Sequence, residues 1–98
     1  MAHRIAVLIF PDFQLLDAAG PVAAFEVASR YRDDHYALRT VAAQAGLVRS
    51  SSGARWDADA LPPASQVDTL LIAGGDGVDA AMADARTRRF VQRCATRG

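Results

Sequence analysis

The chain has 98 residues, of which 51% are apolar and 22% are charged, and its eleven basic residues balance its eleven acidic ones. This length and composition fit one small globular domain and exclude a disordered chain. The zero net charge argues against a nucleic-acid-binding surface, and no apolar run is long enough to span a bilayer. The single cysteine excludes an internal disulfide. We therefore expect a cytoplasmic protein without membrane contact.

The N-terminal segment predicts a strand, a loop and then a helix. Residues 4–10 form an apolar run rich in β-branched side chains, which is typical of a parallel strand covered on both faces. Residues 11–13 end this run. Gly20-Pro21 predicts the start of a helix, because proline is well placed in a first turn. Asp17, an ionisable residue after two leucines, is the first candidate for a functional side chain.

The middle of the chain predicts one helix and a group of strands. A helix is expected over residues 22–31, with an outward Glu26–Arg30 pair. The side chains expected to face the sheet are Val22, Phe25 and Ala28 or Ser29. A second strand is expected over residues 36–43. Two short strands, at 47–50 and 54–56, flank Ser51-Ser52-Gly53 and form either a small hairpin or a meandering edge.

The last third of the chain predicts another buried strand, over residues 67–73, and a helix over residues 78–97. The order β–α–β–(β–β)–β–α indicates an α/β layered fold with a parallel central sheet. No strand follows the last helix, so the strand at 67–73 is expected to lack one neighbour. An unpaired apolar edge is an aggregation hazard. We therefore expect the chain to be the N-terminal part of a longer domain.

Two features carry the chemistry, and each has a structural alternative. Asp17 is either a proton-transfer carboxylate beside a ligand pocket or the cap of the following helix. The loop Gly74-Gly75-Asp76-Gly77 is interpreted as a tight turn that exposes backbone N–H donors to an oxyanion. Residues 75–80 also fit the dinucleotide spacing G-x-G-x-x-A, but the aspartates in this segment would repel a pyrophosphate.

The remaining candidates favour structural roles, and we expect neither a metal nor a cofactor. Cys94 follows Phe90 and Val91 at helical spacing, which indicates a buried apolar residue rather than a nucleophile. His3 is isolated, and residues 33–35 (Asp-Asp-His) are too close together in sequence to converge on one ion. The arginines between positions 86 and 97 are interpreted as a solvated helix face.

Taken together, these motifs resemble the start of a ThiJ/PfpI domain, a superfamily that is class I glutamine amidotransferase-like. The resemblance lies in residues 5–17, in Gly20-Pro21 and Phe25-Glu26, in residues 48–53, and in residues 68–75. It covers nearly the whole chain. The sequence is similar above all to the branch of AraC-type transcriptional regulators that have an amidotransferase-like N-terminal domain. Isonitrile hydratases share the same N-terminal segment. Ala73 stands where the superfamily often has proline.

The resemblance implies a flavodoxin-like three-layer sandwich, incomplete in this chain, and a homodimer. It implies that Asp17 faces a nucleophile elbow and that the backbone of Gly74 and Gly75 helps to form an oxyanion site. Asp17, Gly74 and Gly75 are therefore the expected ligand-binding residues, with Asp17 acting as acid or base only in the full-length domain. The elbow strand is expected just after Gly98, and Cys94 does not occupy the elbow position.

Two functions follow from this resemblance. In the first, residues 1–98 are the N-terminal portion of the ligand-sensing domain of an AraC-family regulator, with no catalysis by this chain alone. The partners would be an unknown small molecule, a second copy, and DNA only through a C-terminal domain. In the second, the chain is a fragment of a stand-alone ThiJ/PfpI enzyme such as an isonitrile hydratase. A small α/β domain without a site of its own is the third interpretation.

Overall fold

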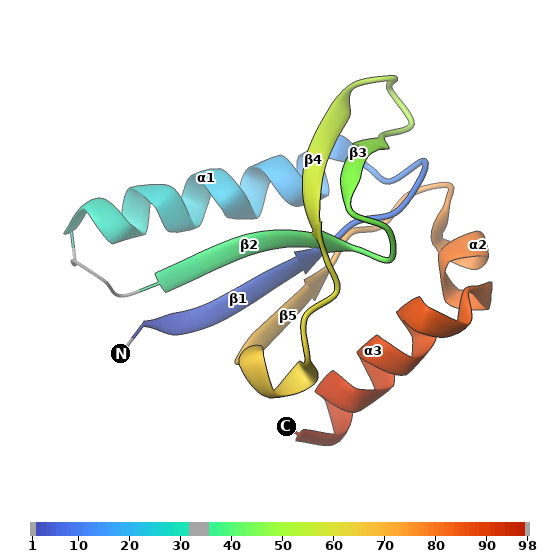
Figure 1. Ribbon diagram of the computed structural model, residues 1–98. Helices are drawn as coiled ribbons and strands as arrows, with labels where there is room; N and C mark the ends of the chain where they lie inside the picture. The colour runs from blue at the N-terminus through green and yellow to red at the C-terminus, as the bar shows by residue number, and fades with distance from the viewer. Residues whose placement is uncertain (1, 32–35, 98) are drawn as a thin grey trace.

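The computed structural model describes residues 2–31 and 36–97. Within these residues the strands are β1 (His3–Leu8), β2 (Tyr36–Ala42), β3 (Gly46–Arg49), β4 (Arg55–Ala60) and β5 (Thr69–Ile72). The helices are α1 (Leu15–Tyr31), α2 (Val78–Ala83) and α3 (Ala85–Arg97), with a short 3-10 turn, η1 (Ala64–Gln66). Figure 1 shows these elements in chain order.

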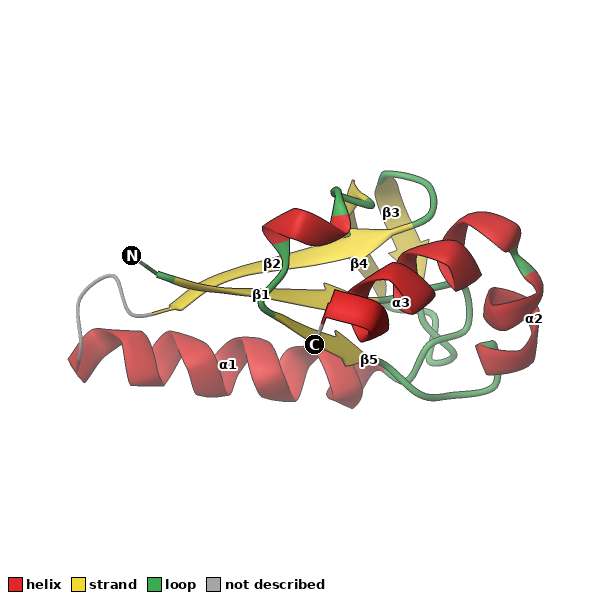
Figure 2. Cartoon of the chain, turned by 90° about the horizontal axis from the view of Figure 1, so that it is seen from below, coloured by secondary structure: helices red, strands yellow, loops and turns green. Residues whose placement is uncertain are grey.

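The elements form three layers. The strands join in the order β3-β4-β2-β1-β5, and every pairing is parallel except the antiparallel β3–β4 pair at one edge. Helix α1 lies on one face of the sheet and α3 on the other (Figure 2). The expected α/β sandwich with a parallel central sheet is therefore confirmed. Its flavodoxin-like arrangement places β1 inside the sheet, between β2 and β5.

Strand β1 forms the centre of the core, as its apolar run predicts. Its side chains alternate between the two faces, so Val7 joins the cluster that includes Ala18 of α1, whereas Leu8 joins the cluster that includes Phe90 of α3. Both Val7 and Leu8 have 0% exposure. The buried run continues through Ile9 and Phe10, beyond the last paired residue of the strand. This burial on both faces is the reason that the segment contains no polar alternation.

The two short strands form a hairpin, which settles the alternative left open by the sequence. Strands β3 and β4 pair in register from Gly46↔Ala58 to Arg49↔Arg55, around the turn at residues 50–54. Strand β4 is longer than expected, and it pairs with β2 only through Val41↔Asp59 and Ala42↔Ala60. The Trp56 indole N–H donates to Thr40 Oγ1 at 3.1 Å and adds a side-chain link between β4 and β2.

Helix α1 begins at Leu15, seven residues before the predicted start, so the prediction that Gly20-Pro21 opens the helix is wrong. Pro21 lies inside the helix, although it cannot donate a backbone hydrogen bond to the carbonyl one turn earlier. Tertiary contacts hold the preceding turn in place. Ala18 is fully buried and Leu15 packs against the same cluster. The predicted inward face and the outward Glu26–Arg30 ion pair, at 3.3 Å, are confirmed.

The C-terminal region contains two helices rather than the single predicted helix. Asp84 separates them because its backbone is extended, with φ −72° and ψ 122°. Its carboxylate Oδ2 accepts hydrogen bonds from the Thr87 N–H at 3.1 Å and from the Thr87 hydroxyl at 2.9 Å. Asp84 is therefore the N-cap of α3. Arg88 in turn donates to the Met82 carbonyl at 3.2 Å, so a cation stabilises the C-terminal end of α2.

Replacing Asp84 by alanine is expected to lower the urea midpoint of unfolding at pH 7. The Thr87 N–H and then the Thr87 hydroxyl hold the pKa of Asp84 below its ordinary value of 3.8. Because folding lowers this pKa, the cap stabilises the fold fully above pH 3.8 and loses its effect as the pH falls further. The difference in urea midpoint between wild type and Asp84→Ala should therefore become smaller in acid. A difference that stays constant with pH would contradict this role of the carboxylate.

Strand β5 is an edge strand, as expected for the strand at 67–73. Among the described strands it pairs only with β1, and Ile72 at its end is 46% exposed. An exposed apolar edge offers unpaired backbone groups to another chain.

We therefore predict that residues 1–98, produced alone, self-associate through β5. Ile72→Lys should reduce the fraction of oligomer in sedimentation velocity, because a charge at the edge opposes strand pairing. Leu16→Lys is the matched control, since Leu16 is an apolar residue that is 69% exposed but lies on α1. Equal effects of the two substitutions would show that β5 is not the contact.

Candidate functional site

The candidate site lies where the chain changes direction across the sheet. From β1 the chain passes into α1 on one face, and from β5 it passes into α2 and α3, with α3 on the other face (Figure 2). The loops at residues 9–14 and 73–77 follow two adjacent parallel strands, β1 and β5, and lead away to opposite faces of the sheet. This topological switch point, at the carboxyl ends of the strands, is where open α/β sheets bind ligands.

Both polar backbone groups of Gly74 are bonded to the segment around the start of α1. The Gly74 N–H donates to Asp17 Oδ2 at 2.8 Å, and the Gly74 carbonyl accepts from the Gln14 N–H at 2.8 Å. Asp17 is thus brought to the glycine loop, 57 residues away in sequence. Of the two alternatives for Asp17, the cap of a following helix is excluded, because Asp17 lies in the first turn of α1 and its carboxylate accepts the Gly74 N–H.

The glycine loop approaches the loop after β1 so closely that side chains have no room. Gly75 has φ +119°, and a Cβ built there would lie 2.7 Å from the Gln14 nitrogen. A Cβ on Gly77 would overlap the carbonyl oxygen of Pro11 and lie 3.1 Å from its carbon. The Gly77 N–H donates to the Asp12 carbonyl at 3.2 Å. These contacts fix the two loops against each other.

The tip of the β3–β4 hairpin completes the site. The Asp12 N–H donates to the Arg49 carbonyl at 2.8 Å, and the Ser51 N–H donates to the Phe13 carbonyl at 3.0 Å. Asp12 has φ 65°, a left-handed conformation that aspartate tolerates better than most residues. Ser50 is 1% exposed, and its hydroxyl is 2.8 Å from the Ser52 hydroxyl. Residues from three loops therefore form one hydrogen-bonded unit.

The available hydrogen-bonding groups define what this site can do. The Gly74 N–H is already bonded to a carboxylate, so it is not a vacant oxyanion donor. Gly75 is exposed, and within residues 2–31 and 36–97 its N–H has no bonded acceptor. Asp17 is also exposed and keeps Oδ1 unbonded within the same ranges. One acceptor and one donor at the carboxyl ends of β1 and β5 are thus without a bonded partner within these ranges.

The other candidates take structural positions. Cys94 packs against the cluster that contains Phe90, as its spacing predicts, but it is half-buried rather than buried. His3 Nε2 is 2.7 Å from Thr69 Oγ1, a contact between β1 and β5. Residues 33–35 lie outside the described residues. Among the residues that are described, no three histidine, cysteine or acidic side chains gather as metal ligands would.

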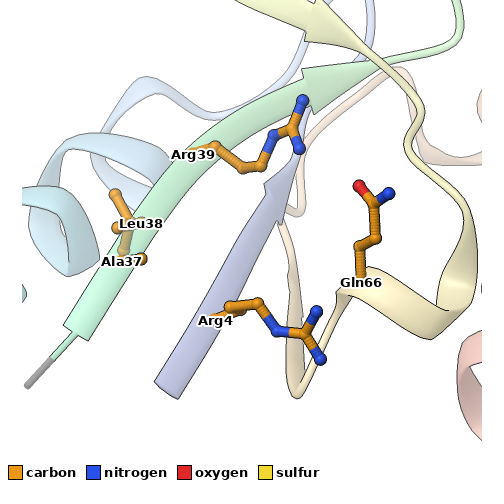
Figure 3. A pocket seen from close by; sticks show the side chains of 5 residues that line it. All are labelled: Arg4, Ala37, Leu38, Arg39 and Gln66. Atoms are coloured by element: carbon orange, nitrogen blue, oxygen red, sulfur yellow. The ribbon is translucent and has the colours of Figure 1, made fainter. Parts of the chain in front are cut away.

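A hollow of about 410 Å³ lies at the opposite end of the sheet, and its charges are already paired. Figure 3 shows Arg4, Arg39 and Gln66 around it. Arg4 forms an ion pair with Asp68 at 3.1 Å, and this hydrogen bonding holds the pKa of Asp68 well below its usual range. Arg39 lies 3.6 Å from Asp59. The two arginines therefore offer no net positive charge for an anion.

The three-layer fold with a candidate site at its switch point defines a flavodoxin-like α/β protein. A model of the DJ-1/PfpI family matches residues 3–98, and the chain belongs to this family. One curated relative, an uncharacterized protein in the cpoL 5' region of Streptomyces lividans, is 42% identical over 77 residues. The match covers 78% of this chain and 54% of that protein, so the chain spans about half the length of this relative.

Solved structures share the fold. A crystal structure of an AraC family transcriptional regulator from Pseudomonas putida matches 98% of this chain and 60% of its own length, with a TM-score of 0.82 and 19% identity. A THiJ/PfpI family protein from Pseudomonas syringae has a TM-score of 0.81 and 25% identity, over 98% of this chain and 39% of its own length. No helix in the described parts of the chain is long and apolar enough to cross a membrane.

Proposed function

We propose that the chain is the N-terminal part of the ligand-sensing, amidotransferase-like domain of an AraC-family transcriptional regulator. In this proposal a small molecule binds beside Asp17 and the Gly74-Gly75 loop of a cytoplasmic homodimer. DNA is contacted through a separate C-terminal domain. The chain supplies the first half of the sensing domain and no catalysis of its own.

One observation carries this proposal over an enzymatic one: the Asp17 carboxylate accepts the Gly74 N–H at 2.8 Å. A backbone donor that stabilises an oxyanion must be aimed at the position where charge develops during the reaction. Here that donor is bonded to a resident negative charge. The arrangement suits a site in which a bound ligand affects the position of the loops that are hydrogen-bonded to one another. The AraC-family regulator among the similar structures supports the same domain type.

A stand-alone enzyme of the isonitrile hydratase type is the second candidate. It is favoured by the exposure of Asp17 and by the unbonded Oδ1, since a general acid or base must reach the substrate. The nucleophile would then lie downstream of Gly98. The intact mass of the natural gene product separates the candidates. About twice the mass of these 98 residues fits one whole domain, and about three times that mass leaves room for a DNA-binding domain.

Asp17→Asn in the full-length protein tests the site. The amide oxygen can still accept the Gly74 N–H, so the fold is retained while the charge is lost. The readout is transcription from the promoters that the full-length protein binds, measured as a panel of growth substrates is added. We expect the response of this transcription to fall about 10-fold in the variant. Asp57→Asn on β4 is the control, because Asp57 is exposed and distant in the sheet from the β1–β5 switch point.

The outcomes of this test differ for each candidate. Loss of turnover of a simple alkyl isonitrile, without any effect on transcription, would support the enzyme. If Asp17→Asn changes neither the transcriptional response nor the turnover, Asp17 has only a structural role, in which its hydrogen bond with Gly74 connects α1 to the glycine loop.

A further inference from the structure

A groove of about 680 Å³ opens beside the candidate site and is not lined by Asp17, Gly74 or Gly75. It lies between β3 and α2, and Figure 1 shows these two elements at the carboxyl end of β1. Residues from the loops after β1, β2 and β5 also line it. Its volume is within the range of small-molecule pockets, about 300–1,000 Å³.

The floor of the groove is mostly apolar and belongs to the core. The buried apolar side chains that line it are Ile9, Phe10, Ala42, Val48 and Ala81, and the buried Gly77 and Thr87 line it as well. Leu47, on β3, lines the groove yet is 67% exposed. An exposed leucine beside a buried apolar floor gives a surface on which the apolar body of a small ligand can be removed from water.

The lining of the groove carries charges of both signs, and three of these side chains are unpaired within the described ranges. Asp12 and Arg49 both line it, and their backbones are joined by the 2.8 Å hydrogen bond from the Asp12 N–H. Nevertheless, within the described ranges the side chains of Asp12, Arg49 and Asp76 form no ion pair or hydrogen bond. Arg86, by contrast, lies 3.9 Å from Asp84.

We infer that this groove binds a small zwitterion with an apolar body. A cationic group would be bound by the carboxylates of Asp12 and Asp76, and a carboxylate by the planar guanidinium of Arg49. A ligand with only one charge would leave groups of the other sign in the lining without a partner. The groove shares Asp12, Arg49 and Gly77 with the loops that form the candidate site, but Asp17, Gly74 and Gly75 do not line it, so the inference can be tested separately from the function proposed for Asp17.

Three probes with the same apolar body test this inference on the full-length protein by isothermal titration. L-phenylalanine is the zwitterion, 2-phenylethylamine lacks the carboxylate, and 3-phenylpropanoate lacks the ammonium group. Phenylalanine is expected to bind at least about 10-fold more tightly than either analogue. Equal binding of phenylethylamine, or no binding of phenylalanine at millimolar concentration, would overturn the zwitterion site.

Substitutions locate the binding. Asp12→Asn and Arg49→Gln should each weaken phenylalanine binding about 10-fold. Asparagine tolerates the positive φ of position 12, so the backbone there is kept. Ala80→Trp, on the exposed part of the lining, should abolish binding by filling the groove. The control variants are Asp57→Asn and Arg55→Gln, at exposed positions of β4 that do not line the groove.

Asp17→Asn separates this inference from the proposed function. If phenylalanine binds the groove, Asp17→Asn leaves its affinity unchanged while altering the transcriptional response or turnover. If Asp17→Asn removes phenylalanine binding and Ala80→Trp does not, the ligand occupies the Asp17 site and the groove inference is wrong.

Discussion

Replacing Phe13 by alanine is expected to lower the free energy of unfolding by about 3–5 kcal/mol. Phe13 has 0% exposure and lies in the larger core cluster with Phe10 and Val48. Its side chain therefore belongs to the core, although its backbone lies in the loop after β1. Because a domain of this size has a total stability of about 5–15 kcal/mol, this single loss would remove a large part of it.

Urea denaturation of the variant and the wild type measures this effect. Phe25→Ala is the matched control, since Phe25 is half-buried on α1 and contacts Tyr36 edge-on, with ring centroids 4.8 Å apart. We expect a smaller loss there, about 1–2 kcal/mol. Equal losses at the two positions would show that Phe13 is not a centre of the core.

The regular elements of this fold could be predicted from the sequence because their signals are local. The apolar run of β1 and the short apolar segment of β5 predicted strands that exist, and the spacing of Val22 and Phe25 predicted the correct face of α1. The hairpin required only a turn between two short strands. In each case the pattern lies within one element and does not depend on the rest of the chain.

The start of α1 and the break before α3 could not be predicted in the same way. Gly20-Pro21 is a strong local signal for a helix start, yet the burial of Ala18 and the bond of Asp17 to Gly74 hold the earlier turn. These are contacts between distant parts of the chain, and they outweigh propensity. The break had a local signal that the helical pattern obscured, namely Asp84 followed by Thr87 at capping distance.

Asp17, Gly74 and Gly75 were named as candidate site residues from the sequence, but the way in which Asp17 meets Gly74 was not predicted. The residues alone left Asp17 open between a cap and a functional carboxylate, and the family resemblance implied a pocket role. Its hydrogen bond to Gly74 depends on the register between β1 and β5. Phe13 and Gly77 were interpreted as loop residues, because their importance comes from other loops that pack against them.

Gly77→Ala is expected to destabilise the fold by on the order of 3 kcal/mol. The added methyl group would overlap the Pro11 carbonyl oxygen and lie 3.2 Å from the ring of Phe10, and a backbone group cannot move aside as a flexible side chain can. The loop after β5 would have to move away from the loop after β1. That movement would also strain the hydrogen bond from the Gly77 N–H to Asp12.

Gly20→Ala is the control for this prediction, because a Cβ there meets no atom within 4 Å. Both changes reduce the freedom of the unfolded chain equally, so that contribution cancels in the comparison. Gly20→Ala should therefore stabilise the helix by about 0.5–1 kcal/mol, while Gly77→Ala destabilises the domain. Equal urea midpoints for the two variants would contradict the close approach of the loops. The same close approach places the Gly74 N–H where it donates to Asp17. The comparison of Gly77→Ala with Gly20→Ala therefore also tests the packing on which the candidate site depends.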